Sequence, residues 1–221
     1  MNREIREFER NPFTREKITS SIGYMYGRCA RQLHYSVLNN VISFSKQDIK
    51  SMNYGTSMHQ KIQKEKFPNM LHEHYVERII PTIYGINRIG ATIDCYDDTR
   101  VIEIKPKYSR MAYYQTLIER FVCPDKPILM YSYIYNKLFP LKADYKMSII
   151  YIGRILTSLV HKPPRVPNSD KRLEPCKSCM FKDKCYSEND YVDSGKQSWN
   201  KYKPLTDFAI NKLLENDQQW K

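Results

Sequence analysis

The sequence lacks an apolar run long enough to cross a membrane, and residues 1–6 contain no apolar core of the kind that a signal peptide needs. Internal repeats and low-complexity segments are also absent. We therefore expect an intracellular, cytoplasmic protein that does not associate with membranes. A chain of 221 residues can bury a sizeable core, either as one domain or as one domain with an elaboration.

Acidic residues are scarce relative to basic ones. The chain has 24 Asp and Glu against 36 Lys and Arg, a formal net charge of +12. It is also 13% aromatic and contains 18 tyrosines. A basic, tyrosine-rich chain suggests a polyanionic partner such as nucleic acid. The alternative is that the basic surplus serves solubility or reflects a lysine-rich source organism.

The six cysteines indicate metal or cluster binding before disulfides, because disulfides are rare in reducing compartments. Three of them lie close together, in the pattern Cys176-x2-Cys179-x5-Cys185. An iron–sulfur cluster generally takes four thiolates, so a fourth ligand must come from elsewhere. Cys29, which lies in a basic and aromatic segment, is the best candidate for that ligand.

Zinc is an alternative occupant of the cysteine site. Cys-x2-Cys is a common zinc half-site, and the spacing alone favours zinc over an iron–sulfur cluster. The spread of the ligands along the whole chain is unlike a compact zinc ribbon and keeps an iron–sulfur cluster in consideration. The two remaining cysteines, Cys95 and Cys123, are interpreted as small buried hydrophobic residues.

Residues 90–105 are the most informative stretch and predict two β-strands joined by a tight turn at Asp97-Asp98. That turn places Asp94 opposite Val101. Alternation of side chains then puts two carboxylates and an ammonium group on one face, from Asp94, Glu103 and Lys105. Such a group is costly without a compensating cation and is typical of a metal-dependent phosphodiesterase. The alternative is an exposed hairpin face with ordinary charges.

The order of the other elements predicts the fold class. The first 45 residues are interpreted as polar and helical, and Ser109 is interpreted as a helix N-cap. Apolar periodicity predicts helices over 46–66, 110–122 and 205–214, and strands over 74–83, 128–135 and 145–152. This order predicts an α/β fold with a mixed central sheet flanked by helices.

A change in composition near residue 163, where prolines become frequent, divides the chain into segments of one compact unit. We expect an N-terminal helical segment with one cluster ligand, a catalytic core, and a C-terminal cysteine-rich segment with a tail. Their predicted bounds are 1–45, 46–162 and 163–221.

Taken together, these motifs resemble a known nuclease family. His59, Asp94, the run Glu103-Ile104-Lys105 and Gln115 resemble the RecB-like branch of the PD-(D/E)xK nucleases. With Cys29 and the downstream cysteine triplet, the chain is similar to the CRISPR-associated exonuclease of RecB type and its relatives in archaea and their viruses. The resemblance covers residues 20–186.

The resemblance implies a restriction-endonuclease-like core and a cluster region formed by the N- and C-terminal segments. It implies that a divalent cation is held by His59, Asp94, Glu103 and the backbone carbonyl of Ile104. It also implies that Lys105 positions or activates the attacking water. Oxygen ligands suit Mg²⁺ or Mn²⁺, and the imidazole favours Mn²⁺.

The function that the resemblance implies is a metal-dependent DNA nuclease, an exonuclease or endonuclease acting on single-stranded DNA or DNA ends. It implies a 4Fe-4S cluster held by Cys29, Cys176, Cys179 and Cys185, and CRISPR integration proteins as partners in antiviral defence. An archaeal cell or a virus-infected host is the expected setting, and a homo-oligomer is a further expectation. The alternatives are a catalytically silent nucleic-acid-binding adaptor of the same fold and a zinc-binding protein.

The sequence departs from the family at the helix after the hairpin. The family pattern there is Gln-x3-Tyr, whereas this chain has Gln115-x3-Glu119. Gln115 keeps the expected substrate contact, and the tyrosine contact is assigned to Tyr114, with Tyr113 as the alternative.

Overall fold

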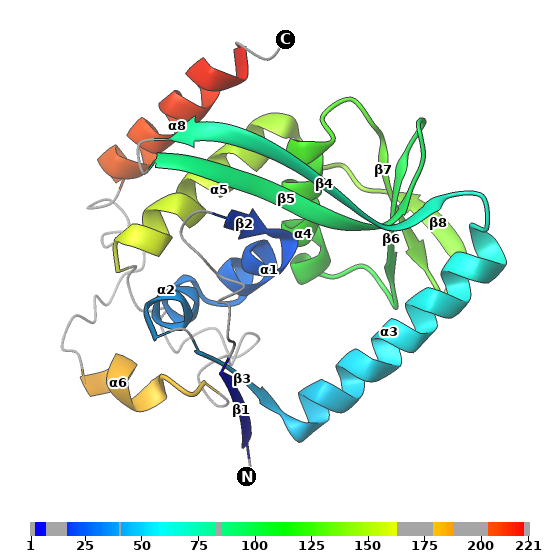
Figure 1. Cartoon of the computed structure of the whole chain (residues 1–221), viewed down its shortest axis with the longest axis horizontal. Helices are drawn as coiled ribbons and strands as arrows, with labels where there is room; N and C mark the ends of the chain where they lie inside the picture. The colour runs from blue at the N-terminus through cyan, green and yellow to red at the C-terminus, as the bar shows by residue number, and fades with distance from the viewer. Residues whose placement is uncertain are drawn as a thin grey trace.

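The computed structural model describes residues 3–7, 17–39, 41–82, 85–162, 179–187 and 203–218 (Figure 1). Its centre is a mixed six-stranded sheet flanked by helices, so the predicted α/β class is confirmed. The sheet strands are β2 (Lys17–Thr19), β4 (Leu71–Thr82), β5 (Gly85–Tyr96), β6 (Val101–Lys105), β7 (Ile128–Ser132) and β8 (Lys137–Pro140). Their order is β2-β5-β6-β7-β8, and β4 also pairs with β5.

The remaining elements comprise helices and a small second sheet. The described helices are α1 (Ser20–Arg28), α2 (Ala30–Asn39), α3 (Lys46–Lys66), α4 (Arg110–Val122), α5 (Tyr145–Val160), α6 (Lys182–Ser187) and α8 (Lys203–Gln218). β1 (Arg3–Glu7) and β3 (Val41–Ser45) pair as a separate antiparallel sheet. Among the described helices, none combines the length and the apolar character needed to span a bilayer.

Strand β6 is buried on both faces, and this splits the core into two clusters. Val101 joins the larger cluster, which contains residues from α1, α4, α5 and α8. Ile102 and Ile104 point the other way, into a smaller cluster that includes Ile62 of α3. The site lies in this sheet, between α3 and α4.

The sequence predicted a helical N-terminal segment, but the described part of this segment is not helical throughout. Lys17–Thr19 forms the short strand β2, parallel to β5, and Ile18 is fully buried. α1 follows at once, with the Thr19 side chain accepting the Ile22 N–H as its N-cap. A three-residue strand carries too little pattern to be predicted, and pairing with β5 decides its conformation.

The prediction of a strand over residues 145–152 is wrong, because this segment is the first half of α5. Its apolar residues are partly β-branched, which favoured a strand. The apolar run continues to Val160, however, and the Asp144 side chain accepts the Met147 N–H as a helix N-cap. A short apolar run does not distinguish a buried helix from a strand by periodicity, and here the length decides.

The predicted strand over 128–135 is too long. β7 ends at Ser132, and a turn that contains Asn136 at φ 49° leads into β8, which the sequence did not predict. The predicted register of the β5–β6 hairpin is also wrong by two residues, since Tyr96, and not Asp94, lies opposite Val101. Its loop spans residues 97–100, where Asp97 Oδ1 accepts the Thr99 and Arg100 N–H groups.

Candidate metal centre

Asp94 lies where β5 and β6 separate. The two strands pair at Cys95–Ile102 and Tyr96–Val101, the pairs next to the loop. The Asp94 carboxylate then takes the place of a backbone partner, because its Oδ2 accepts the Ile104 N–H at 2.7 Å. The N–H and C=O of one strand residue point to the same side, so the Ile104 carbonyl also faces this gap. The sequence-predicted carbonyl ligand therefore lies on the Asp94 side of β6.

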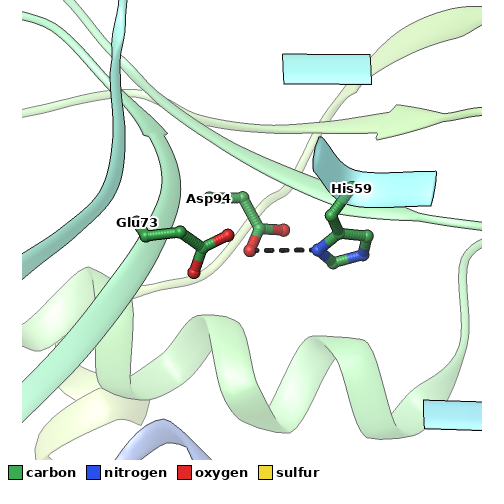
Figure 2. A group of neighbouring side chains, drawn as sticks. All are labelled: His59, Glu73 and Asp94. Carbon is green, nitrogen blue, oxygen red and sulfur yellow. Dashed lines mark ion pairs between the residues drawn. The ribbon is translucent and has the colours of Figure 1, made fainter. Parts of the chain in front are cut away.

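His59 and Glu73 converge on Asp94 from two other elements (Figure 2). His59, on α3, places Nδ1 3.4 Å from Asp94 Oδ1. Glu73, on β4, completes a group whose ligand atoms all lie within 4.8 Å of one another. One imidazole and two carboxylates suit Mn²⁺ or Mg²⁺.

Glu73 was missed because the predicted strand began one residue after it, at His74. In the structure β4 begins at Leu71, and the pairs His72–Cys95 and His74–Ile93 place Glu73 beside Asp94. Its φ of 50° is uncommon for a residue other than glycine. Such strain persists where the surroundings enforce it, and it often marks a functional site.

Gln63 links the two carboxylate residues. Its Nε2 donates to Glu73 Oε1 and to the Asp94 backbone oxygen, both at 2.8 Å. The side chain is buried and comes from α3, one helical turn after His59. α3 therefore supplies a ligand candidate and also fixes the strands that carry the other two.

Glu103 and Lys105 lie on the α4 side of the gap. Glu103 is fully buried, and its Oε1 accepts from Lys105 Nζ and, at 2.7 Å, from Gln115 Nε2. The structure thus brings Gln115 to the predicted acid. Glu103 was predicted as a metal ligand, but it is not one of the three residues whose ligand atoms cluster within 4.8 Å. Its Oε1 instead contacts Lys105 and Gln115.

Burial and the charges of the site shift several pKa values. Burial, followed by the negative charge of Asp94, raises the pKa of Glu103 to about 7. Burial would also raise the pKa of Asp94, but the His59 hydrogen bond and the Lys105 charge hold it below its usual range. Burial alone would lower the pKa of Lys105, but Glu103 and Asp94 raise it above its ordinary value. Lys105 is therefore an ammonium group that can position water and stabilise negative charge.

Glu119 is a second fully buried acid on α4, and sequence reasoning treated it only as a departure from the family. Within the described residues, neither of its oxygens receives a hydrogen bond from a donor, and the same holds for Glu103 Oε2. The two carboxyl groups lie within hydrogen-bonding reach of each other, and burial followed by the Glu103 charge raises the pKa of Glu119 well above its usual value. A proton on Glu119 lets it donate to Glu103.

In the metal-free protein, we expect the free energy of unfolding to fall as the pH rises from about 5 through the folded-state pKa of Glu103, about 7. A carboxyl whose pKa is raised by folding stabilises fully below its unfolded pKa and loses that stability as the pH rises through the folded value. Folding raises the pKa of both Glu103 and Glu119, so both carboxyl groups contribute to this loss of stability. The pKa of His59 is also raised, so His59 contributes to the same loss. Urea unfolding in a chelator should show this slope, and Glu119→Gln should flatten it. An unchanged slope in that variant would mean that Glu119 is already ionised.

The predicted cluster ligands are partly described. Cys176 lies outside the described residues, whereas Cys29, Cys179 and Cys185 are within them. Cys29 ends α1 and precedes α2, and its Sγ accepts the Gln32 N–H at 3.4 Å.

The C-terminal cysteines approach the same helix. The Phe181 ring lies 5.5 Å from the Tyr35 ring of α2, and Lys184 Nζ lies 5.1 Å above that ring. Figure 1 shows α6 beside α2. The segment with Cys179 and Cys185 therefore packs against the helix that begins directly after Cys29.

Cys95 and Cys123 are buried, as the sequence predicted. Burial raises the pKa of the Cys95 thiol to about 12 and that of Cys123 to about 11. A thiol that resists ionisation is a poor metal ligand, so both residues fit a packing role.

Tyr114 does not point into the metal centre. Its ring stacks on Tyr151 at 5.1 Å, and its hydroxyl accepts from Arg110 Nε. The ring also lies against Gly27 of α1, where a Cβ would come within 2.1 Å of it. Tyr114 therefore joins α1, α4 and α5, on a different side of α4 from Gln115.

Comparisons with known proteins add a likeness in fold. No family model matches the chain, and no curated protein matches it. Among solved structures, the crystal structure of SSO0001 is similar, with a TM-score of 0.52 and 18% sequence identity over 77% of this chain and 85% of that chain. At this identity the likeness concerns the fold alone, an α/β core with a mixed sheet.

Proposed function

We propose that the chain is a divalent-cation-dependent deoxyribonuclease with a PD-(D/E)xK core of the RecB-like branch. The observation that carries the proposal is the convergence of His59, Glu73 and Asp94 where β5 and β6 separate, next to the ion pair between Lys105 and the buried Glu103. Glu73 and Asp94 place two carboxylates beside one imidazole, and Asp94 is buried with a pKa held below its usual range. A divalent cation would offset this charge.

The roles of the residues follow from their positions. His59, Glu73 and Asp94 would hold the cation together with the Ile104 carbonyl, and the resemblance adds Glu103 as a further ligand. A bound Mg²⁺ or Mn²⁺ would polarise the scissile phosphate and lower the pKa of a water ligand. Lys105, as an ammonium group, would orient that water and stabilise the charge that develops on the phosphate. Gln115 holds Glu103 in place for this work.

We also propose a structural iron–sulfur cluster held by Cys29, Cys176, Cys179 and Cys185. The contact of the 179–187 segment with α2 supports this, because it brings two of the proposed ligands to the helix that follows Cys29. The cluster would hold the two ends of the chain together. Hydrolysis needs no electron transfer, so its role is structural.

The experiment that tests the proposed activity is cleavage of end-labelled single- and double-stranded DNA by purified protein with Mn²⁺, with Mg²⁺ and with chelator. We expect cleavage with either cation, faster with Mn²⁺, and none with chelator. DNA binding without cleavage under all three conditions would favour the silent adaptor and contradict the proposal.

A further inference from the structure

An open hollow of about 400 Å³ lies beside the metal centre, between the start of α4 and the β7–β8 hairpin. Its lining is dominated by aromatic side chains from these two segments. They are Tyr108, Tyr113, Tyr135 and Phe139, and Met130 and Lys142 also line the hollow. Tyr108 and Tyr135 are more than half exposed, at 57% and 59%. The metal centre uses none of these side chains.

The sheet register fixes the distance between the hollow and the metal centre. Glu103 lies beside Met130 of β7, and Met130 lies beside Phe139 of β8. Neighbours across a sheet share a face, so all three side chains are on the α4 side. Phe139 is two strand spacings from Glu103, or roughly 10 Å. Tyr108 follows Lys105 by only three residues on the other side of the hollow.

The charges around the hollow are mostly positive. Lys142 lines it, and Lys137 continues the row from Lys105 through Ser132 on the same face of the sheet. Lys107 is exposed in the segment that leads to Tyr108. One acid, Asp144, interacts with Tyr113, but its Oδ1 caps α5 through the Met147 N–H at 2.9 Å. Flat aromatic faces with lysines at the rim suit a base attached to a phosphate backbone.

We propose that this hollow holds an unpaired base of the DNA strand whose phosphate lies at the metal centre. The inference rests on the proposed nuclease function and deepens it by assigning a base-binding site beside the metal centre. A paired base is stacked inside the duplex and presents only its edge, whereas an unpaired base can enter and stack on Tyr135, Tyr108 or Phe139. The hollow would thus select single strands by shape and stacking, without reading sequence.

The test measures binding of a labelled oligothymidylate in chelator, so that cleavage plays no part. Tyr135→Ala is expected to weaken binding by about 5- to 150-fold, the equivalent of one lost base stack. Tyr24→Ala, a change at an exposed tyrosine on α1, is the matched control and should bind as wild type. Tyr108→Ala provides a second variant at the hollow.

An abasic scan identifies the stacked base. Removing single bases along the oligonucleotide should weaken wild-type binding at one or two positions, and Tyr135→Ala should no longer respond at those positions. Equal responses of wild type and both hollow variants would overturn the proposal, and so would the absence of oligonucleotide binding. Base-dependent binding without Mn²⁺-dependent cleavage would instead overturn the nuclease function and leave the base site standing.

Discussion

Asp94→Asn is expected to reduce Mn²⁺-dependent cleavage by about a thousandfold or more. A metal ion acting on a phosphate contributes several kcal/mol to transition-state stabilisation, and each 1.4 kcal/mol is worth about tenfold in rate. Asparagine is nearly isosteric, and its carbonyl oxygen can still accept the Ile104 N–H, so the gap between β5 and β6 should keep its shape. The measurement is single-turnover cleavage of end-labelled single-stranded DNA, with circular dichroism to check the fold.

The same assay takes a matched control from the hairpin loop. Asp98→Asn removes an exposed carboxylate near the site in sequence and should cleave as wild type. Glu103→Ala and Lys105→Ala should lose activity as Asp94→Asn does, and all three should still bind DNA. Full activity in Asp94→Asn would show that Asp94 is not part of the catalytic centre.

Cys29→Ser is expected to abolish iron binding and to cause a large loss of folded stability. The proposed cluster joins the α1–α2 junction to the C-terminal segment, so losing one ligand releases a link between distant parts of the chain. The anaerobically purified wild type should be brown and contain iron and sulfide, and the variant should be colourless. Thermal unfolding of both proteins measures the stability.

The buried cysteines provide the control for this prediction. Cys95→Ala and Cys123→Ala should keep the colour and lose only on the order of 1 kcal/mol, the effect of a small packing defect. Colour loss in Cys95→Ala but not in Cys29→Ser would show that Cys29 is not the fourth ligand. If elemental analysis finds zinc and no iron, the cysteines form a zinc site and not an iron–sulfur cluster.

Elements with strong local signals were predicted well from the sequence. The predicted helix over 46–66 coincides with α3, and Ser109 caps α4 as its position suggested, through the Ala112 N–H. The tail helix α8 is present and longer than predicted. Capping residues and helical periodicity act within a few residues, so the sequence shows them directly.

The errors have three different causes: the details of a loop, the ambiguity of an apolar run, and pairing with a strand that is distant in the sequence. The Asp97 carboxylate organises a loop of four residues in place of a two-residue turn, and this shifts the hairpin register by two. The run from residue 145 became a helix because it is long, is capped by Asp144 and packs between α4 and α8. β2 exists only because β5 pairs with it.

The candidate site divides in the same way. Asp94, Glu103 and Lys105 could be found from their spacing, because they sit on adjacent strands of one hairpin. Glu73 and Gln63 could not, since their place depends on how β4 and α3 dock beside β5. The burial of Glu119 against Glu103 depends likewise on how α4 packs on the sheet.

Direct titration of the purified protein with Mn²⁺, followed by electron paramagnetic resonance of the free ion, tests the central claim most directly. We predict saturable binding by the wild type, weakened in Glu73→Gln and His59→Ala and lost in Asp94→Asn, with Asp98→Asn unchanged. Wild-type protein that binds no Mn²⁺, or Asp94→Asn that binds it as tightly as wild type, would contradict a cation site at the point where β5 and β6 separate.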